Sequence, residues 1–159
     1  MNLSGIACLS GCLLFGAVMI LASITDMCSR RIGNPLIVVL LVGYLALAIP
    51  AGLSWTAMLM ALLAGVSVFC LGLWCFSRGW LGGGDVKLAA VAALWLGAPL
   101  VVPLIVYMTA IGAVLTVILL IREKYRAPPV PMPGELPYGP AIAMAGLLLL
   151  PHSPWFTGL

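Results

Sequence analysis

Apolar residues run along the chain in six blocks, which short polar segments rich in glycine or proline separate. The blocks extend over about Ile6–Thr25, Pro35–Ile49, Trp55–Phe76, Val86–Ala98, Leu100–Ile121 and Leu136–Leu150. One helical crossing of a hydrocarbon layer roughly 30 Å thick needs about 20 apolar residues. The pattern therefore predicts an all-α membrane protein, a polytopic bundle of about six transmembrane helices.

Polar and helix-breaking residues mark several of the predicted boundaries. Asn34 stands before Pro35, which favours an N-cap followed by proline at the first helical position, and Ser54 is placed to cap the third block. The fourth and fifth blocks cannot form one helix, because Pro99 and Pro103 would lie in its interior. We therefore expect a helical hairpin with its turn at Gly97.

Composition narrows the class of protein further. Of the 159 residues, 64% are hydrophobic and only 7% charged, and the mean hydropathy is +1.26. These values exclude a soluble domain and leave room for a single membrane domain over residues 1–159. The net charge of +3 does not imply nucleic-acid binding, and the five cysteines form no CxxC pair. We expect no metal ion and no cofactor. We expect membrane lipid to surround the protein.

The basic residues predict how the chain is oriented. All seven fall in alternate connections, as expected when positive charge stays in the cytoplasm. The first block has no basic residue before Arg30, so we expect a retained span and not a cleaved signal. A proline-rich cytoplasmic loop is predicted over about residues 122–136, and both termini are predicted outside the cytoplasm. The basic residues are Arg30, Arg31, Arg78, Lys87, Arg122, Lys124 and Arg126.

Two of the four acidic residues lie at the edges of apolar blocks. Asp26 ends the first block and Asp85 precedes the fourth, so the topology brings both carboxyl groups to the cytoplasmic surface. Each has a simpler interpretation: Asp26 pairs with Arg30 on a helix end, and Asp85 caps a helix after a flexible glycine turn. If the two carboxyl groups meet, one holds a proton while the other accepts one from water, which is general acid–base chemistry.

Three short motifs now give a resemblance. Along the chain they are, in order, Asp26 followed by Arg31-Ile32-Gly33-Asn34-Pro35-Leu36, then Gly82-Gly83-Gly84-Asp85-Val86-Lys87-Leu88, and then Leu136-Pro137-Tyr138-Gly139-Pro140-Ala141. In these motifs the chain resembles the type IV prepilin peptidases, membrane aspartic proteases with a Gly-x-Gly-Asp motif. It is most similar to the short form of the tight-adherence, or Flp-type, pilus systems. Gly33 stands where the family usually has proline.

The resemblance implies an enzyme of the bacterial inner membrane that removes the leader peptide of prepilins or pseudopilins at the cytoplasmic face. Asp26 and Asp85 would be its catalytic pair. The substrate would carry a basic leader and an apolar helix. Substrate-binding or loop-shaping roles would fall to Gly82, Gly84, Lys87, Tyr138 and Gly139. The extra domain with paired CxxC motifs that longer members use for methylation is not found here, so no N-methyltransferase activity is expected.

Two other functions fit the same residues. In a small proton- or cation-coupled transporter, Asp26 and Asp85 would belong to an ion path, although no acidic residue lies at mid-membrane and no inverted repeat is visible. In a noncatalytic assembly subunit, replacing either aspartate would be nearly harmless. His152 is expected on the outer side, away from both aspartates.

Overall fold

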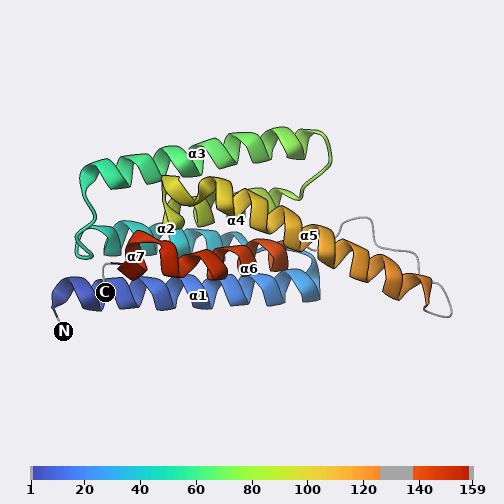
Figure 1. Ribbon diagram of the computed structural model, residues 1–159, viewed down its shortest axis with the longest axis horizontal. Helices are drawn as coiled ribbons and strands as arrows, with labels where there is room; N and C mark the ends of the chain where they lie inside the picture. Colours follow the sequence, from blue (N-terminus) through green and yellow to red (C-terminus); the bar gives the residue numbers. More distant parts are fainter. Residues whose placement is uncertain (1, 126–137, 158–159) are drawn as a thin grey trace.

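A computed structural model describes residues 2–125 and 138–157, and this part of the chain is helical with short connections. Six helices form the bundle, and a short seventh follows them (Figure 1). They are α1 (Leu3–Ser29), α2 (Asn34–Ala48), α3 (Trp55–Ser77), α4 (Gly83–Leu96), α5 (Val101–Lys124), α6 (Gly139–Leu149) and α7 (Pro154–Thr157), with 3-10 turns at Ala98–Leu100 and Leu150–His152. The predicted all-α fold is confirmed.

Successive helices run in opposite directions along the bundle. The C-terminal ends of α1, α3 and α5 lie on the right of Figure 1, together with the N-terminal ends of α2, α4 and α6. We call this the carboxylate end, because it contains Asp26 and Asp85. The start of α1, the α2–α3 connection, the α4–α5 turn and α7 lie at the other end, the aromatic end. The structure thus confirms the hairpin at Gly97, where φ is +83°.

Helix α4 lies at the centre of the bundle and contacts α2, α3, α5 and α6. Its residues from Leu88 to Leu96 are all buried. Small residues make the closest approach possible: a Cβ on Gly65 of α3 would lie 3.1 Å from the carbonyl oxygen of Ala90, and one on Gly72 would lie 2.7 Å from Val86 Cγ1. Such small-residue contacts let helix backbones pack closely in membranes.

Four aromatic side chains close the aromatic end. The ring of Trp95 lies 4.6 Å from that of Trp155 and 5.6 Å from that of Phe15, and Tyr44 packs edge-on against both tryptophans. The indole N–H of Trp95 donates to the carbonyl oxygen of Leu40 at 3.0 Å. This cluster joins α1, α2, α4 and α7.

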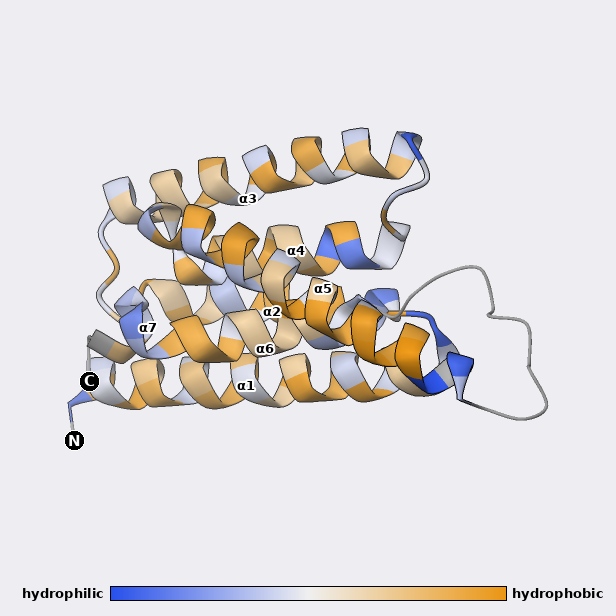
Figure 2. Cartoon of the chain, turned by 45° about the vertical axis from the view of Figure 1, so that its right-hand side comes forward, coloured by the Kyte–Doolittle hydropathy of each residue, from blue (hydrophilic) through white to orange (hydrophobic). Residues whose placement is uncertain are grey.

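Large apolar side chains also cover the outside of the bundle, and polar residues gather near the helix ends (Figure 2). Within the described residues, three helical segments are long and apolar enough to cross a membrane: Leu3–Ser29, Trp55–Ser77 and Ala98–Arg122. Helices α2, α4 and α6 have 15, 14 and 11 residues and are shorter than a full crossing. The six predicted helices are therefore present, but only half of them have spanning length.

Two predicted boundaries need correction, and one is confirmed. Gly33, not Asn34, is the N-cap of α2, because Asn34 is already helical and its side chain bonds elsewhere. Helix α5 continues to Lys124, so residues 122–124 of the predicted loop are helical, and residues 126–136 lie outside the described part. The Ser54 cap is confirmed, since its Oγ accepts from the N–H of Ala57 at 3.2 Å.

Candidate active site

Asp26 lies in the last turn of α1 and is 5% exposed. One of its carboxyl oxygens, Oδ2, accepts a hydrogen bond of 2.8 Å from the backbone N–H of Gly139. Gly139 is the first residue of α6, where backbone N–H groups have no partner within their own helix. The C-terminal end of α1 therefore meets the N-terminal end of α6 through this carboxyl group.

Gly139 packs too closely on Asp26 for any other residue to fit without movement. A Cβ at this position would lie 2.7 Å from Oδ2, 2.8 Å from Cβ and 2.9 Å from Cγ of Asp26. Real Cβ atoms essentially never approach other heavy atoms within 3.0 Å. The contact thus requires glycine for steric reasons at the position that also supplies the hydrogen-bond donor.

Tyr138 precedes Gly139 and is the N-cap of α6. Its ring lies against α5 at Gly112, where an added Cβ would come within 2.6 to 2.8 Å of three ring and hydroxyl atoms. The carbonyl oxygen of Tyr138 accepts from the N–H of Ile142 at 3.1 Å and so begins the helix. The tyrosine therefore anchors the start of α6 on α5.

Asp85 is the third residue of α4 and is 8% exposed. The predicted Asp85 cap is wrong: Gly82 is the N-cap, and its carbonyl oxygen accepts from the N–H of Val86 at 3.1 Å. The carboxyl group of Asp85 folds back over this cap, because a Cβ on Gly82 would lie 3.0 Å from Asp85 Oδ2. The predicted flexible glycine turn is thus partly helical, starting at Gly83.

Gly84 faces the connection between α1 and α2. An added Cβ would lie 3.1 Å from Ile32 Cβ and 3.5 Å from the Ile32 nitrogen. The neighbour of Asp85 in sequence is therefore in contact with the segment that follows Asp26. The loop-shaping roles expected of Gly82 and Gly84 stay predictions, and the structure adds that each glycine lies in close contact with a neighbouring residue.

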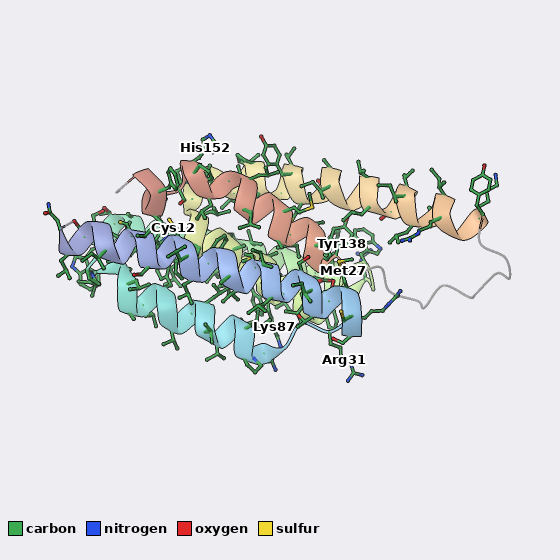
Figure 3. All side chains as sticks on the ribbon, turned by 90° about the horizontal axis from the view of Figure 1, so that it is seen from below. Cys12, Met27, Arg31, Lys87, Tyr138 and His152 are labelled. Atoms are coloured by element: carbon green, nitrogen blue, oxygen red, sulfur yellow. The ribbon has the colours of Figure 1, made fainter. Side chains whose placement is uncertain are left out.

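Lys87 bonds to the start of α2. Its Nζ donates to Asn34 Oδ1 at 3.0 Å, which ties the fifth residue of α4 to the first residue of α2. In Figure 3, Lys87 and Arg31 lie near this end of the molecule, and His152 lies toward the opposite end. The predicted separation of His152 from the aspartates therefore agrees with the structure.

The structure places the residues that the sequence singled out as a site at the carboxylate end. Both aspartates are buried at the carboxylate end, Asp26 on α1 and Asp85 on α4, and both helices contact α6. Sequence reasoning did not identify Gly112, and it took Asn34 for a helix cap. A glycine inside a long apolar helix gives no local signal for the tyrosine that packs on it. The described residues contain no group of three or more His, Cys, Asp or Glu that could hold a metal ion.

Carboxyl groups in buried positions can transfer protons. A carboxylate removed from bulk water accepts a proton from a nearby water, and a protonated carboxyl group donates one. Gly139 lies against the carboxyl group of Asp26, and Gly82 lies against that of Asp85. Because glycine has no side chain, the backbone is close to each carboxyl group.

Comparison with known proteins gives one match. The family model described as the type IV leader peptidase family matches residues 13–120, a segment that includes both aspartates. No curated protein and no solved structure matches the chain.

Proposed function

This chain belongs to the type IV leader peptidase family and is a protease of that general kind, and we propose that it cleaves the leader from Flp-type prepilins or pseudopilins. Asp26 and Asp85 are the proposed catalytic pair, which makes the enzyme an aspartic endopeptidase. The single observation that carries the proposal is the burial of two carboxyl groups at one end of a membrane-type bundle. The chain has only two aspartates in all.

The proposed reaction needs one ionised and one protonated carboxyl group. The carboxylate takes a proton from water as the water oxygen bonds to the scissile carbonyl carbon. The protonated group then donates its proton to the amide nitrogen as the carbon–nitrogen bond breaks. Two nearby carboxyl groups share a proton readily because both cannot ionise at low cost.

The location of the site follows from charge and topology. Described basic residues follow α1 and α3 and lie in the last turn of α5, all at the carboxylate end, which supports a cytoplasmic position for this end under the positive-inside rule. The proposed enzyme is a multi-pass protein of the bacterial inner membrane with both termini outside the cytoplasm. A prepilin would approach with its basic leader in the cytoplasm and its apolar helix in the lipid.

We assign no methyltransferase activity to this chain. The sequence has no CxxC pair of the kind that accompanies methylation in longer relatives. The product would therefore be a cleaved pilin with an unmodified N-terminal amine. The transporter alternative has no observation in its favour beyond the two acids.

The direct test is coexpression with a Flp-type prepilin, following leader removal by gel shift and mass spectrometry. Wild type should cleave, and Asp26→Asn and Asp85→Asn should lose cleavage while inserting normally. Glu123→Gln is the matched control, because it removes a carboxyl group outside the pair and should keep full cleavage. Cleavage by either aspartate variant at the wild-type rate would refute the two-carboxyl mechanism.

A further inference from the structure

A buried polar contact at the proposed site comes from the backbone. Of the described side-chain hydrogen bonds, the one from Gly139 to Asp26 joins residues 113 positions apart and is buried. It fixes the position of one carboxyl oxygen relative to α6. A carboxyl group held by a backbone N–H has fewer orientations than one at the end of a free rotamer.

We propose that the first turn of α6 is a positioning element for Asp26, with Gly139 as the positioning residue. This inference rests on the proposed function, because it concerns how the assigned carboxyl group is held. The N–H of Gly139 directs Oδ2, and the missing side chain lets α6 approach the Asp26 side chain closely enough for the bond to form. Gly139 need not touch substrate to have this effect.

A second contact fixes the positioning element itself. The ring of Tyr138 occupies the space that Gly112 leaves open on α5. Tyr138 and Gly139 are adjacent, so a displacement of the ring moves the N–H that holds Asp26. In this arrangement α5 sets the position of the start of α6, and the start of α6 sets the orientation of Asp26.

The chain also provides a matched control. Gly16 on α1 likewise faces α6, but a Cβ there would lie 3.7 Å from Leu147 Cδ2, which is an ordinary van der Waals distance. Gly16→Ala therefore adds the same methyl group between the same two helices without a clash. Gly139→Ala and Gly16→Ala differ in the contact with the carboxyl group.

The first experiment measures cleavage of a purified Flp-type prepilin by lipid-reconstituted protein. Gly139→Ala should lower kcat about 100-fold, since a displacement near 1 Å at a reacting group has effects of this size. The KM for prepilin should change less than about twofold, because a loss that falls on the position of a reacting group appears in kcat. Gly16→Ala should match wild type in both constants. A wild-type kcat for Gly139→Ala would overturn the inference.

A spectroscopic readout separates positioning from general damage. Aspartate labelled with ¹³C at the side-chain carboxyl gives two signals, because the chain has two aspartates, and Asp26→Asn assigns them. Gly139→Ala should shift the Asp26 signal and leave the Asp85 signal in place. An unmoved Asp26 signal, or an equal shift of both, would contradict a specific contact with Asp26.

A double-mutant cycle tests the connection to α5 and does not require Gly139 to be changed. Gly112→Ala should lower kcat roughly tenfold, since it displaces the Tyr138 ring and acts only indirectly on Asp26. Tyr138→Ala removes the ring, so adding Gly112→Ala to it should cost no further activity. Additive losses in the double variant would show that the two residues act independently and would overturn this part of the inference.

Failure of the inference and failure of the proposed function give different results. If Asp26→Asn or Asp85→Asn cleaves normally, the two-carboxyl mechanism fails, and the positioning role fails with it. If both aspartate variants are inactive while Gly139→Ala keeps the wild-type kcat and Asp26 signal, only the positioning role fails.

Discussion

The aromatic cluster leads to a prediction about stability that is separate from activity. Trp95 is 1% exposed and packs against Phe15, Tyr44 and Trp155. Replacing it by alanine removes one member of this cluster and the hydrogen bond to Leu40. Trp95 lies ten residues after Asp85 on α4, which is about 15 Å along the helix axis. Trp95→Ala should therefore destabilise the bundle with little effect on cleavage per folded molecule.

The expected magnitude follows from packing, because lipid is as apolar as a protein core and gives little hydrophobic driving force between helices. A cavity of roughly 140 Å³ costs about 3 kcal/mol at about 24 cal/mol per Å³ if it stays open. The lost hydrogen bond adds about 0.6 kcal/mol in a membrane setting. Trp95→Ala should thus lower the free energy of unfolding by about 4 kcal/mol. Trp95→Phe leaves a smaller cavity, near 40 Å³, and should cost about 1.5 kcal/mol.

Thermal unfolding can be followed through buried thiols. Cys8 and Cys12 are buried, so a thiol-reactive fluorogenic dye reports unfolding once the other three cysteines are replaced by serine. Trp95→Ala should lower Tm by about 8 to 16 °C, using the scaling of roughly 2 to 4 °C per kcal/mol for chains of this size.

The control for this experiment is an exposed tryptophan. Trp55 is 77% exposed at the start of α3, and Trp55→Ala should change Tm by less than about 2 °C. A Tm for Trp95→Ala within 2 °C of wild type would refute the reasoning that the cluster holds the aromatic end together. A loss of cleavage beyond the loss of folded protein would show that the two ends of α4 are coupled.

Three further predictions concern single contacts. Ser54→Ala removes the confirmed cap of α3 and should lower the unfolding free energy by about 1 kcal/mol, measured by the same thermal assay. Lys87→Met and Asn34→Ala each break the 3.0 Å bond between α4 and α2, and their effects of about 1 kcal/mol on stability should not add in the double variant. Gly72→Ala places a Cβ 2.7 Å from Val86 Cγ1 and should lower both Tm and kcat, because Val86 follows Asp85 in the first turn of α4.

Two of these predictions have a control variant, and the double variant supplies the test of the third. Ser67→Ala changes an exposed serine inside α3, whose hydroxyl bonds only its own helix, and should leave stability within about 0.5 kcal/mol of wild type. Additive losses for Lys87→Met and Asn34→Ala would mean that the bond between them contributes nothing measurable. For Gly72→Ala the comparison is Gly16→Ala, and equal behaviour of the two would argue against tight packing of α3 on the start of α4.

The sequence by itself determined the helices and the side of the bundle on which the two aspartates lie. Apolar blocks, prolines and the Ser54 cap act within a few residues, so their effects can be read locally. Counting the crossings then places Asp26 and Asp85 at one end, because each helix reverses the direction of the chain. The family resemblance likewise rested on short continuous motifs, and the family match confirms it.

Only the tertiary structure decided what holds Asp26 in place and how the starts of α2, α4 and α6 are fixed. The bond from Gly139 to Asp26 spans 113 residues, and the bond from Lys87 to Asn34 spans 53. The fit of Tyr138 on Gly112 depends on how α5 and α6 cross. A local sequence pattern shows that a glycine, an asparagine or a backbone N–H group is available for a contact between helices. Which partner it meets depends on the packing of several helices at once, since distances of a few tenths of an ångström decide whether a side chain fits.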